Sequence, residues 1–125
     1  MTTDPTITPT RNGMLTIGDK FPSFKLDACI SIDKKGDDNF KTISLSDYKA
    51  KWKVIYFWPL DFTFVCPTEV LNFSAAADKL GQLNCQVLGI SVDSVFVHKA
   101  WVDTKREDGG LGGSLNYPLL SDLNK

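Results

Sequence analysis

Apolar and polar residues alternate in two segments near the start of the chain. Residues 15–30 (LTIGDKFPSFKLDACI) predict an extended segment with a first strand or hairpin, and residues 40–45 (FKTISL) predict an edge strand. DKKGDD, between the two, is expected to be a polar loop. SDYKAKW, after the second segment, predicts a turn or a single helical turn. The first part of the chain is therefore expected to be mainly extended.

Two uninterrupted apolar runs follow, and the segment between them has helical spacing. Residues 53–58 are rich in β-branched and aromatic side chains, which predicts a strand buried on both faces, and residues 86–92 (QVLGISV) predict a second strand. Residues 67–83 predict a helix, with one apolar face made by Val70, Phe73, Ala77 and Leu80. Strand, helix and strand together predict a right-handed parallel βαβ unit, and so an α/β fold.

The pattern after this unit predicts a second helix and a further strand. A helix is expected after Ser94, ending in the charged residues 103–108, with an apolar side formed by Val95, His98, Ala100, Trp101 and Val102. GGLGG at residues 109–113 predicts a flexible break, and YPLL predicts the start of another strand. Residues 1–13 show no periodicity and are expected to form a flexible arm, whereas residues 15–125 form the predicted domain.

Composition and charge exclude several classes of function. The chain has 125 residues, of which 42% are hydrophobic and 23% charged, which is typical of a globular protein. Lys and Arg number 14 against 15 Asp and Glu, so no net positive charge attracts nucleic acid or an anionic membrane. No apolar stretch is long enough for a membrane span or a secretory signal, and a cytoplasmic location is expected.

Three cysteines, Cys29, Cys66 and Cys85, cannot all pair within one chain. Their wide spacings resemble neither a disulfide framework nor a zinc site, and the single histidine adds no close metal partner, so neither a metal nor a cofactor is expected. Cys29 and Cys85 are expected to be structural and mostly buried, because free cysteine usually behaves as a small hydrophobic residue. His98 is expected to be a packing or surface residue, and Trp101 a core residue.

The segment PLDFTFVCPTEV, residues 59–70, follows the first apolar strand and leads into the helix. Cys66 falls at the helix entrance, where the free amides and the positive end of the helix dipole favour a thiolate. Thr63 lies three residues earlier, within reach of the sulfur or of a small ligand, and Pro59 offers an apolar wall without an N–H. These residues predict a nucleophilic cysteine. The alternatives are a buried structural cysteine and a threonine that only caps the helix.

The same residues resemble the active-site signature of the peroxiredoxins, in particular the typical two-cysteine group that includes the peroxide-reducing component of bacterial alkyl hydroperoxide reductase. The resemblance extends over LTIGDKFPSF, WKVIYFWPLDFTFVCPTE, LGISVDS, Trp101, GGLG and YPLLSD. It implies a thioredoxin-like fold with N-terminal additions. It also implies thiol-specific reduction of hydrogen peroxide and organic hydroperoxides, which protects against oxidative stress.

Each matching residue takes an expected role from the resemblance. Cys66 would be the peroxidatic cysteine that cycles through sulfenic acid, and Thr63 would hydrogen-bond its thiolate and the peroxide. Pro59 would shield the pocket, and the amides of Val65 and Cys66 would polarise the bound oxygens. Glu69 would orient an arginine that lies further along the chain in the family.

That arginine and the resolving cysteine lie C-terminal to the LSD block in the family, beyond Lys125, so the chain is expected to be a fragment or partial gene product. The implied partners are thioredoxin or a dedicated flavoprotein disulfide reductase, and further copies of the chain in a dimer or a ring of dimers. The alternative function is an inactive truncated peroxiredoxin that acts as a binding or holdase module through exposed sheet edges. A thioredoxin-type disulfide reductase is disfavoured, because it needs a second cysteine where Glu69 stands.

Overall fold

The structure is a computed structural model that describes residues 14–30, 39–63 and 66–124, with the side chain of Cys66 outside the description. Its elements, in chain order, are β1 (Lys25–Cys29), β2 (Phe40–Ser44), η3 (Leu45–Tyr48), β3 (Trp52–Phe57), α1 (Cys66–Gln82), β4 (Cys85–Ser91), α2 (Val95–Asp103), η4 (Arg106–Asp108) and β5 (Leu119–Ser121). The predicted strands and both predicted helices are therefore confirmed. The predicted flexible arm and the whole of the predicted DKKGDD loop lie outside the described residues.

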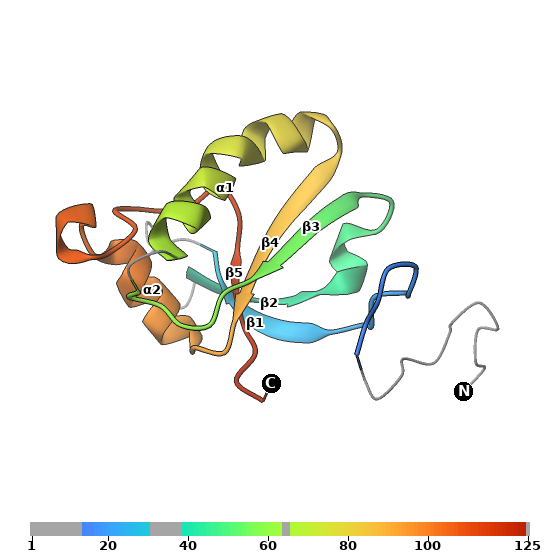
Figure 1. Cartoon of the computed structure of the whole chain (residues 1–125), viewed down its shortest axis with the longest axis horizontal. Coiled ribbons are helices and arrows are strands. Elements are labelled where there is room, and N and C mark those ends of the chain that lie inside the picture. Colours follow the sequence, from blue (N-terminus) through green and yellow to red (C-terminus); the bar gives the residue numbers. More distant parts are fainter. Residues whose placement is uncertain (1–13, 31–38, 64–65, 125) are drawn as a thin grey trace.

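One mixed sheet organises the molecule, with strand order β2-β1-β5-β4-β3 (Figure 1). β3 and β4 are parallel neighbours joined through α1, so the predicted parallel βαβ unit is present. β4 also pairs in parallel with β5, whereas β1 runs antiparallel to both β2 and β5. β2 lies at one end of the sheet, as the alternating pattern of residues 40–45 predicts.

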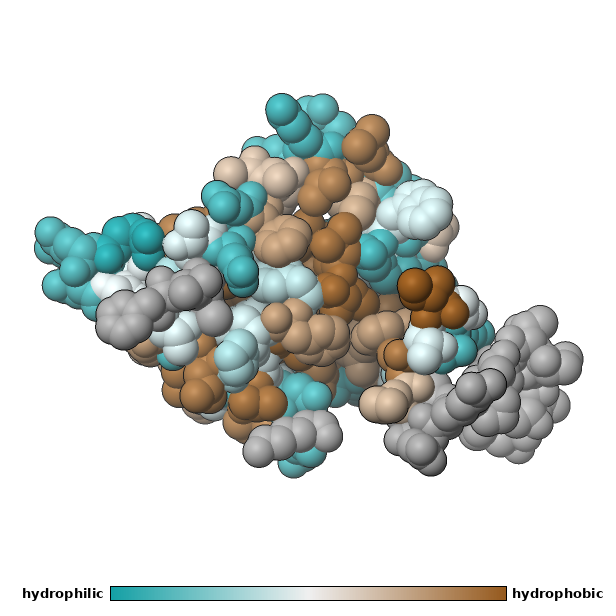
Figure 2. Space-filling model, viewed as in Figure 1, coloured by the Kyte–Doolittle hydropathy of each residue, from teal (hydrophilic) through white to brown (hydrophobic). Residues whose placement is uncertain are grey.

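The prediction that residues 53–58 form a strand buried on both faces is wrong in its burial. β3 ends the sheet in the described part of the chain, and its six residues are only half-buried or exposed. Trp52 is 78% exposed and Phe57 63% exposed. Figure 2 shows hydrophobic residues gathered over this strand, in the middle of the view. Pattern alone reports that a strand is apolar, but its place in the sheet decides how much of it is covered.

Two buried clusters lie on opposite faces of the sheet, because successive strand residues point to opposite sides. One contains Val87 and Leu119 and receives both helices through Val70 and Trp101. The other contains their chain neighbours Leu88 and Leu120, together with Ala28, Ile43 and Ile90. None of the helices in the described part of the chain is long and apolar enough to cross a membrane.

α2 buries His98, Trp101 and Val102, as the helical spacing predicts, but Ala100 is exposed, contrary to expectation. The Ser94 hydroxyl caps this helix by accepting the Val97 N–H at 3.2 Å. Residues 109–113 do not form the predicted flexible break, because their backbone is bonded to α2. The Leu111 N–H donates to the Trp101 carbonyl at 2.9 Å. Leu111 is buried in the core, and a Cβ at Gly110 would lie 2.0 Å from the Thr104 carbonyl oxygen, which explains the glycine there.

Candidate active site between β3 and α1

α1 begins at Cys66, the residue that the sequence predicts as the nucleophile. The helix is 17 residues long, and its first amides have no partner within the helix. The partial positive charge at this end favours an anion, and so a thiolate over a thiol, on a residue of the first turn. Position at a helix N-terminus is the structural feature that the predicted chemistry of Cys66 requires.

The turn that leads to Cys66 is held by β4 and by the loop after β4. The Trp58 N–H donates to the Ile90 carbonyl at 3.2 Å, which continues the β3–β4 pairing by one residue. Three residues later, the Asp61 N–H donates to the Asp93 carboxylate at 2.7 Å. In Figure 1 this green turn passes beside α2. The start of the turn is therefore attached to the carboxyl end of the sheet, the edge at which α/β proteins place their ligands.

Phe62 adopts a left-handed backbone conformation, with φ of 57°. Such a conformation is uncommon for a bulky residue other than glycine and costs about 1 to 2 kcal/mol. Phe62 is 50% exposed, and the centroid of its ring lies 6.3 Å from that of the Trp101 ring. Strained residues concentrate in functional segments, where the surrounding structure holds them in place.

The other predicted site residues lie around this turn. The Thr63 hydroxyl donates to the Leu60 carbonyl at 3.3 Å, and its side chain is half-buried. Pro59 is exposed. Glu69 lies in the first turn of α1 and is also exposed. Val65 lies outside the described residues, so the structure brings Pro59, Thr63, Glu69 and the backbone of Cys66 into one short segment.

A buried polar network underlies the turn, and it centres on Asp61. One carboxylate oxygen accepts the Trp58 indole N–H at 2.8 Å, and the other lies 2.6 Å from His98 Nδ1. The second ring nitrogen of His98 lies 3.0 Å from the Leu120 carbonyl oxygen. Both side chains of the Asp61–His98 pair are fully shielded from solvent.

A second polar chain ties α1 to the segment before β5. The Tyr117 hydroxyl donates to the Val70 carbonyl at 2.7 Å and lies 2.5 Å from the Tyr56 hydroxyl. Burial raises the pKa of Tyr56 and of Tyr117 well above the usual range of a phenol. Both hydroxyls therefore stay protonated and act as hydrogen-bond donors.

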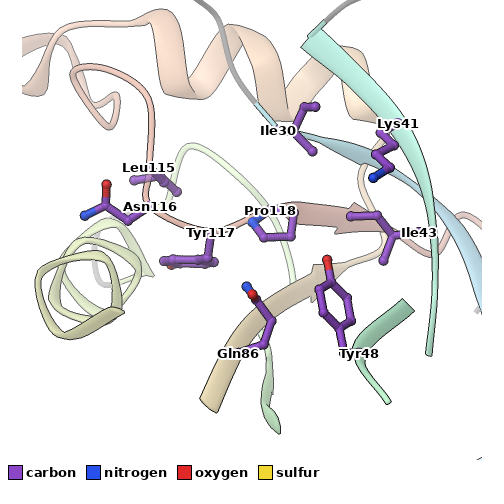
Figure 3. Close-up of a pocket in the computed structure, with 9 residues that line it drawn as sticks. All are labelled: Ile30, Lys41, Ile43, Tyr48, Gln86, Leu115, Asn116, Tyr117 and Pro118. Carbon is purple, nitrogen blue, oxygen red and sulfur yellow. The ribbon is translucent and has the colours of Figure 1, made fainter. Parts of the chain in front are cut away.

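An open pocket of about 370 Å³ lies elsewhere on the molecule and contains none of the predicted site residues. Figure 3 shows Lys41 and Ile43 on one side of it, Tyr48 and Gln86 on another, and Pro118 between them. Of the other two cysteines, Cys29 is buried as predicted, whereas Cys85 is only half-buried.

A comparison with protein-family models matches residues 17–125 to the AhpC/TSA family. The chain belongs to this family. Peroxiredoxin-2 of Pongo abelii is 50% identical over 114 residues, which make up 91% of this chain and 60% of that protein. Peroxiredoxin-4 of Dictyostelium discoideum is 51% identical over 102 residues, 82% of this chain and 37% of that protein. The chain thus spans about half the length of the curated relatives that it matches.

Solved structures of AhpC/TSA proteins match the fold as well. The reduced 2-Cys peroxiredoxin of Plasmodium vivax superposes with a TM-score of 0.77 at 39% identity, over 87% of this chain and 54% of that one. The AhpC of Mycobacterium tuberculosis superposes with a TM-score of 0.75 at 40% identity, over 89% and 64% of the two chains. The predicted resemblance to two-cysteine peroxiredoxins and the predicted thioredoxin-like α/β fold are confirmed.

Sequence reasoning missed Asp61 and its partners as a unit. It treated His98 as a packing or surface residue, and the histidine is indeed buried, but its bond to Asp61 is a long-range contact. One signal was available: Asp61 is the only charged residue between Lys53 and Glu69. A lone carboxylate inside an apolar stretch indicates a buried, paired charge.

Proposed function

We propose that this protein is a thiol peroxidase, in which Cys66 reduces hydrogen peroxide and organic hydroperoxides. One observation carries the proposal: Cys66 is the first residue of α1, and Thr63 and Pro59 precede it at the spacing of the peroxiredoxin signature. Membership of the AhpC/TSA family and the named peroxiredoxins among its relatives support it.

The reaction follows from a thiolate at that position. The Cys66 sulfur attacks one oxygen of the peroxide, so that an S–O bond forms while the O–O bond breaks. The sulfur is oxidised to a sulfenic acid, and the departing oxygen takes a proton and leaves as water or an alcohol. Negative charge grows on that oxygen as it leaves, and amides aimed from a helix N-terminus stabilise it.

The neighbouring residues have the roles that the signature implies. The Thr63 hydroxyl turns from the Leu60 carbonyl toward the thiolate and the peroxide, and its long 3.3 Å bond to that carbonyl costs little to give up. Pro59 limits the access of water to the pocket, and the amides of Val65 and Cys66 bind the peroxide oxygens. Glu69, in the first helical turn, orients an arginine supplied from outside residues 1–125.

Regeneration of Cys66 needs a second thiol. A thiol condenses with the sulfenic acid to give a disulfide and water, and a reductase then reduces that disulfide. We assign the second thiol to a resolving cysteine outside residues 1–125, and the reductase to thioredoxin or a flavoprotein disulfide reductase. We also infer a homodimer or a ring of dimers, and a cytoplasmic location.

Sulfenic-acid trapping tests this function directly. The protein is exposed to hydrogen peroxide in the presence of a dimedone-type probe, and the labelled cysteine is located by mass spectrometry. We expect Cys66 to be labelled much faster than Cys29 or Cys85, and the Cys66→Ser variant to lose this fast labelling. The half-exposed Cys85 is the matched internal control, and equal labelling of Cys66 and Cys85 contradicts the proposal.

A second candidate function draws on the exposed edge at β3. Trp52 and Phe57 leave apolar surface open at the end of the sheet, which suits a module that binds another chain without catalysis. The trapping experiment separates the two functions, because a non-enzymatic binding module has no reason to show fast labelling at Cys66.

A further inference from the structure

The buried Asp61 side chain is held from two directions in the turn before Cys66. Its Oδ1 accepts the Trp58 indole N–H at 2.8 Å, and its Oδ2 lies 2.6 Å from His98 Nδ1. Its backbone N–H is fixed as well, by the Asp93 carboxylate at 2.7 Å. Asp61 thereby joins the turn to Trp58, the residue after β3, to α2 and to the loop after β4.

The bonds of His98 fix the number of protons in this network. Nε2 lies 3.0 Å from the Leu120 carbonyl oxygen, which can only accept, so Nε2 carries a hydrogen. The contact between Nδ1 and Asp61 then holds one proton, either on an imidazolium or on the carboxyl group. The Asp61–His98 pair has no net charge in either form. Its contribution is therefore a pattern of donors and acceptors that only one orientation of the turn satisfies.

The pair lies where it can control the geometry of the reacting segment. Asp61 stands between Pro59 and Thr63, and the next residue, Phe62, is in the left-handed conformation that the surroundings must hold in place. α2 supplies His98, and the imidazole is anchored at its far side to β5. The turn is thus braced against two elements that belong to the core.

We propose that the Asp61–His98 pair positions the turn so that Thr63 and Cys66 meet a bound peroxide in the reactive geometry. The inference rests on the proposed peroxidase function and adds two positioning residues to it. Neither residue needs to touch the peroxide. Both act by fixing the backbone that carries Thr63, because displacements of about 1 Å cost a reaction on the order of 100-fold in rate.

Two substitutions at one position separate geometry from charge. Asp61→Asn keeps the pattern, because the amide oxygen accepts the Trp58 indole N–H and the amide N–H₂ donates to His98 Nδ1. Asp61→Leu keeps a side chain of similar size but leaves the Trp58 indole N–H and His98 Nδ1 without their hydrogen-bond partner. Val87→Ala is the matched control, since it opens a cavity in the buried core, in the cluster that also contains Trp58, but removes none of the hydrogen bonds that hold Asp61 and His98.

The measured quantity is the rate at which Cys66 reacts with hydrogen peroxide divided by the rate at which it reacts with iodoacetamide. Both rates are followed by mass spectrometry of the peptide that contains Cys66. Both reagents need the thiolate, but only peroxide needs the positioned pocket. We expect the ratio in Asp61→Asn to stay within about threefold of the ratio in the protein without substitutions. Asp61→Leu should lower the ratio on the order of 100-fold. Val87→Ala should destabilise the fold and leave the ratio unchanged.

Three results would overturn the inference: an unchanged ratio in Asp61→Leu, an equal loss in Asp61→Asn, or an equal loss in Val87→Ala. If Asp61→Leu does not fold, Trp58→Phe carries the test, because it removes one donor to Asp61 and keeps an aromatic ring. It should lower the ratio about tenfold, and no change again overturns the inference. A failure of the proposed peroxidase function would be seen separately, because Cys66 of the protein without substitutions would then react with peroxide no faster than Cys85.

Discussion

The two hydroxyls of Tyr56 and Tyr117 should contribute unequally to stability, although they touch each other. The Val70 carbonyl can only accept, so the Tyr117 hydroxyl donates to it at 2.7 Å. The Tyr56 hydroxyl must then donate to the Tyr117 oxygen, 2.5 Å away. The bonds therefore run in one direction, from β3 through Tyr117 to α1.

This direction sets the magnitude for each substitution. Tyr56→Phe removes one hydrogen bond and leaves only an oxygen lone pair unused, which costs about 1 kcal/mol of unfolding free energy. Tyr117→Phe removes the bond to Val70 and also leaves the Tyr56 hydroxyl as a donor without an acceptor, which costs about 2 to 3 kcal/mol. The double variant has no unpaired donor and should cost no more than Tyr117→Phe alone. The coupling between the two positions is then about 1 kcal/mol.

Urea unfolding of the protein and these three variants measures the free energies, with constant slopes as the check that only stability has changed. Tyr48→Phe is the control, since the half-buried Tyr48 hydroxyl faces the open pocket (Figure 3), and it should cost less than about 0.5 kcal/mol. An equal cost for Tyr56→Phe and Tyr117→Phe, or strict additivity in the double variant, would refute the assigned direction.

Two further predictions follow from the same core. A Cβ at Gly89 would lie 2.8 Å from an atom of the Trp58 ring and 2.8 Å from the Tyr56 hydroxyl oxygen, so Gly89→Ala should lower the unfolding free energy by about 1 to 3 kcal/mol, measured by urea unfolding. Gly81→Ala is the control. It lies in an open part of α1 and should raise the unfolding free energy by up to about 1 kcal/mol. Because burial raises the pKa of Tyr56 and Tyr117, their neutral forms are favoured in the folded state, and the unfolded chain ionises first. The contribution of these two tyrosines to the unfolding free energy should be constant below about pH 10 and should fall above it by up to about 1.4 kcal/mol per pH unit for each tyrosine. Urea unfolding from pH 9 to 11 measures this fall, and Tyr56→Phe should make it less steep.

The local order of strands and helices could be predicted because it depends on neighbouring residues. The spacing of Val70, Phe73, Ala77 and Leu80 follows a helix, and all four contact the core. Strand neighbours could not be read in the same way. The apolar run at 53–58 has the composition of a central strand, but the described sheet places it at the end, and its burial follows from that order.

The same distinction holds for the candidate site. Cys66, Thr63 and Pro59 stand within one short segment, so a sequence motif can indicate them together. Asp61 and His98 are 37 residues apart and meet only because α2 packs beside the turn that leads to α1. No local pattern contains that contact, and the left-handed backbone of Phe62 is likewise imposed by the fold rather than by the residue.

The proposed reactivity of Cys66 depends on two different properties of its surroundings. A thiolate at Cys66 is favoured by the N-terminus of α1, which the local sequence specifies through Pro67 and the helical spacing. In the proposed reaction, the direction from which a peroxide meets that thiolate depends on the turn before Cys66, and long-range contacts hold that turn. Substitutions in the helix should therefore change the reactivity of Cys66 toward all electrophiles. Substitutions in the buried network should change its preference for peroxide, and the ratio of the two rates distinguishes these causes.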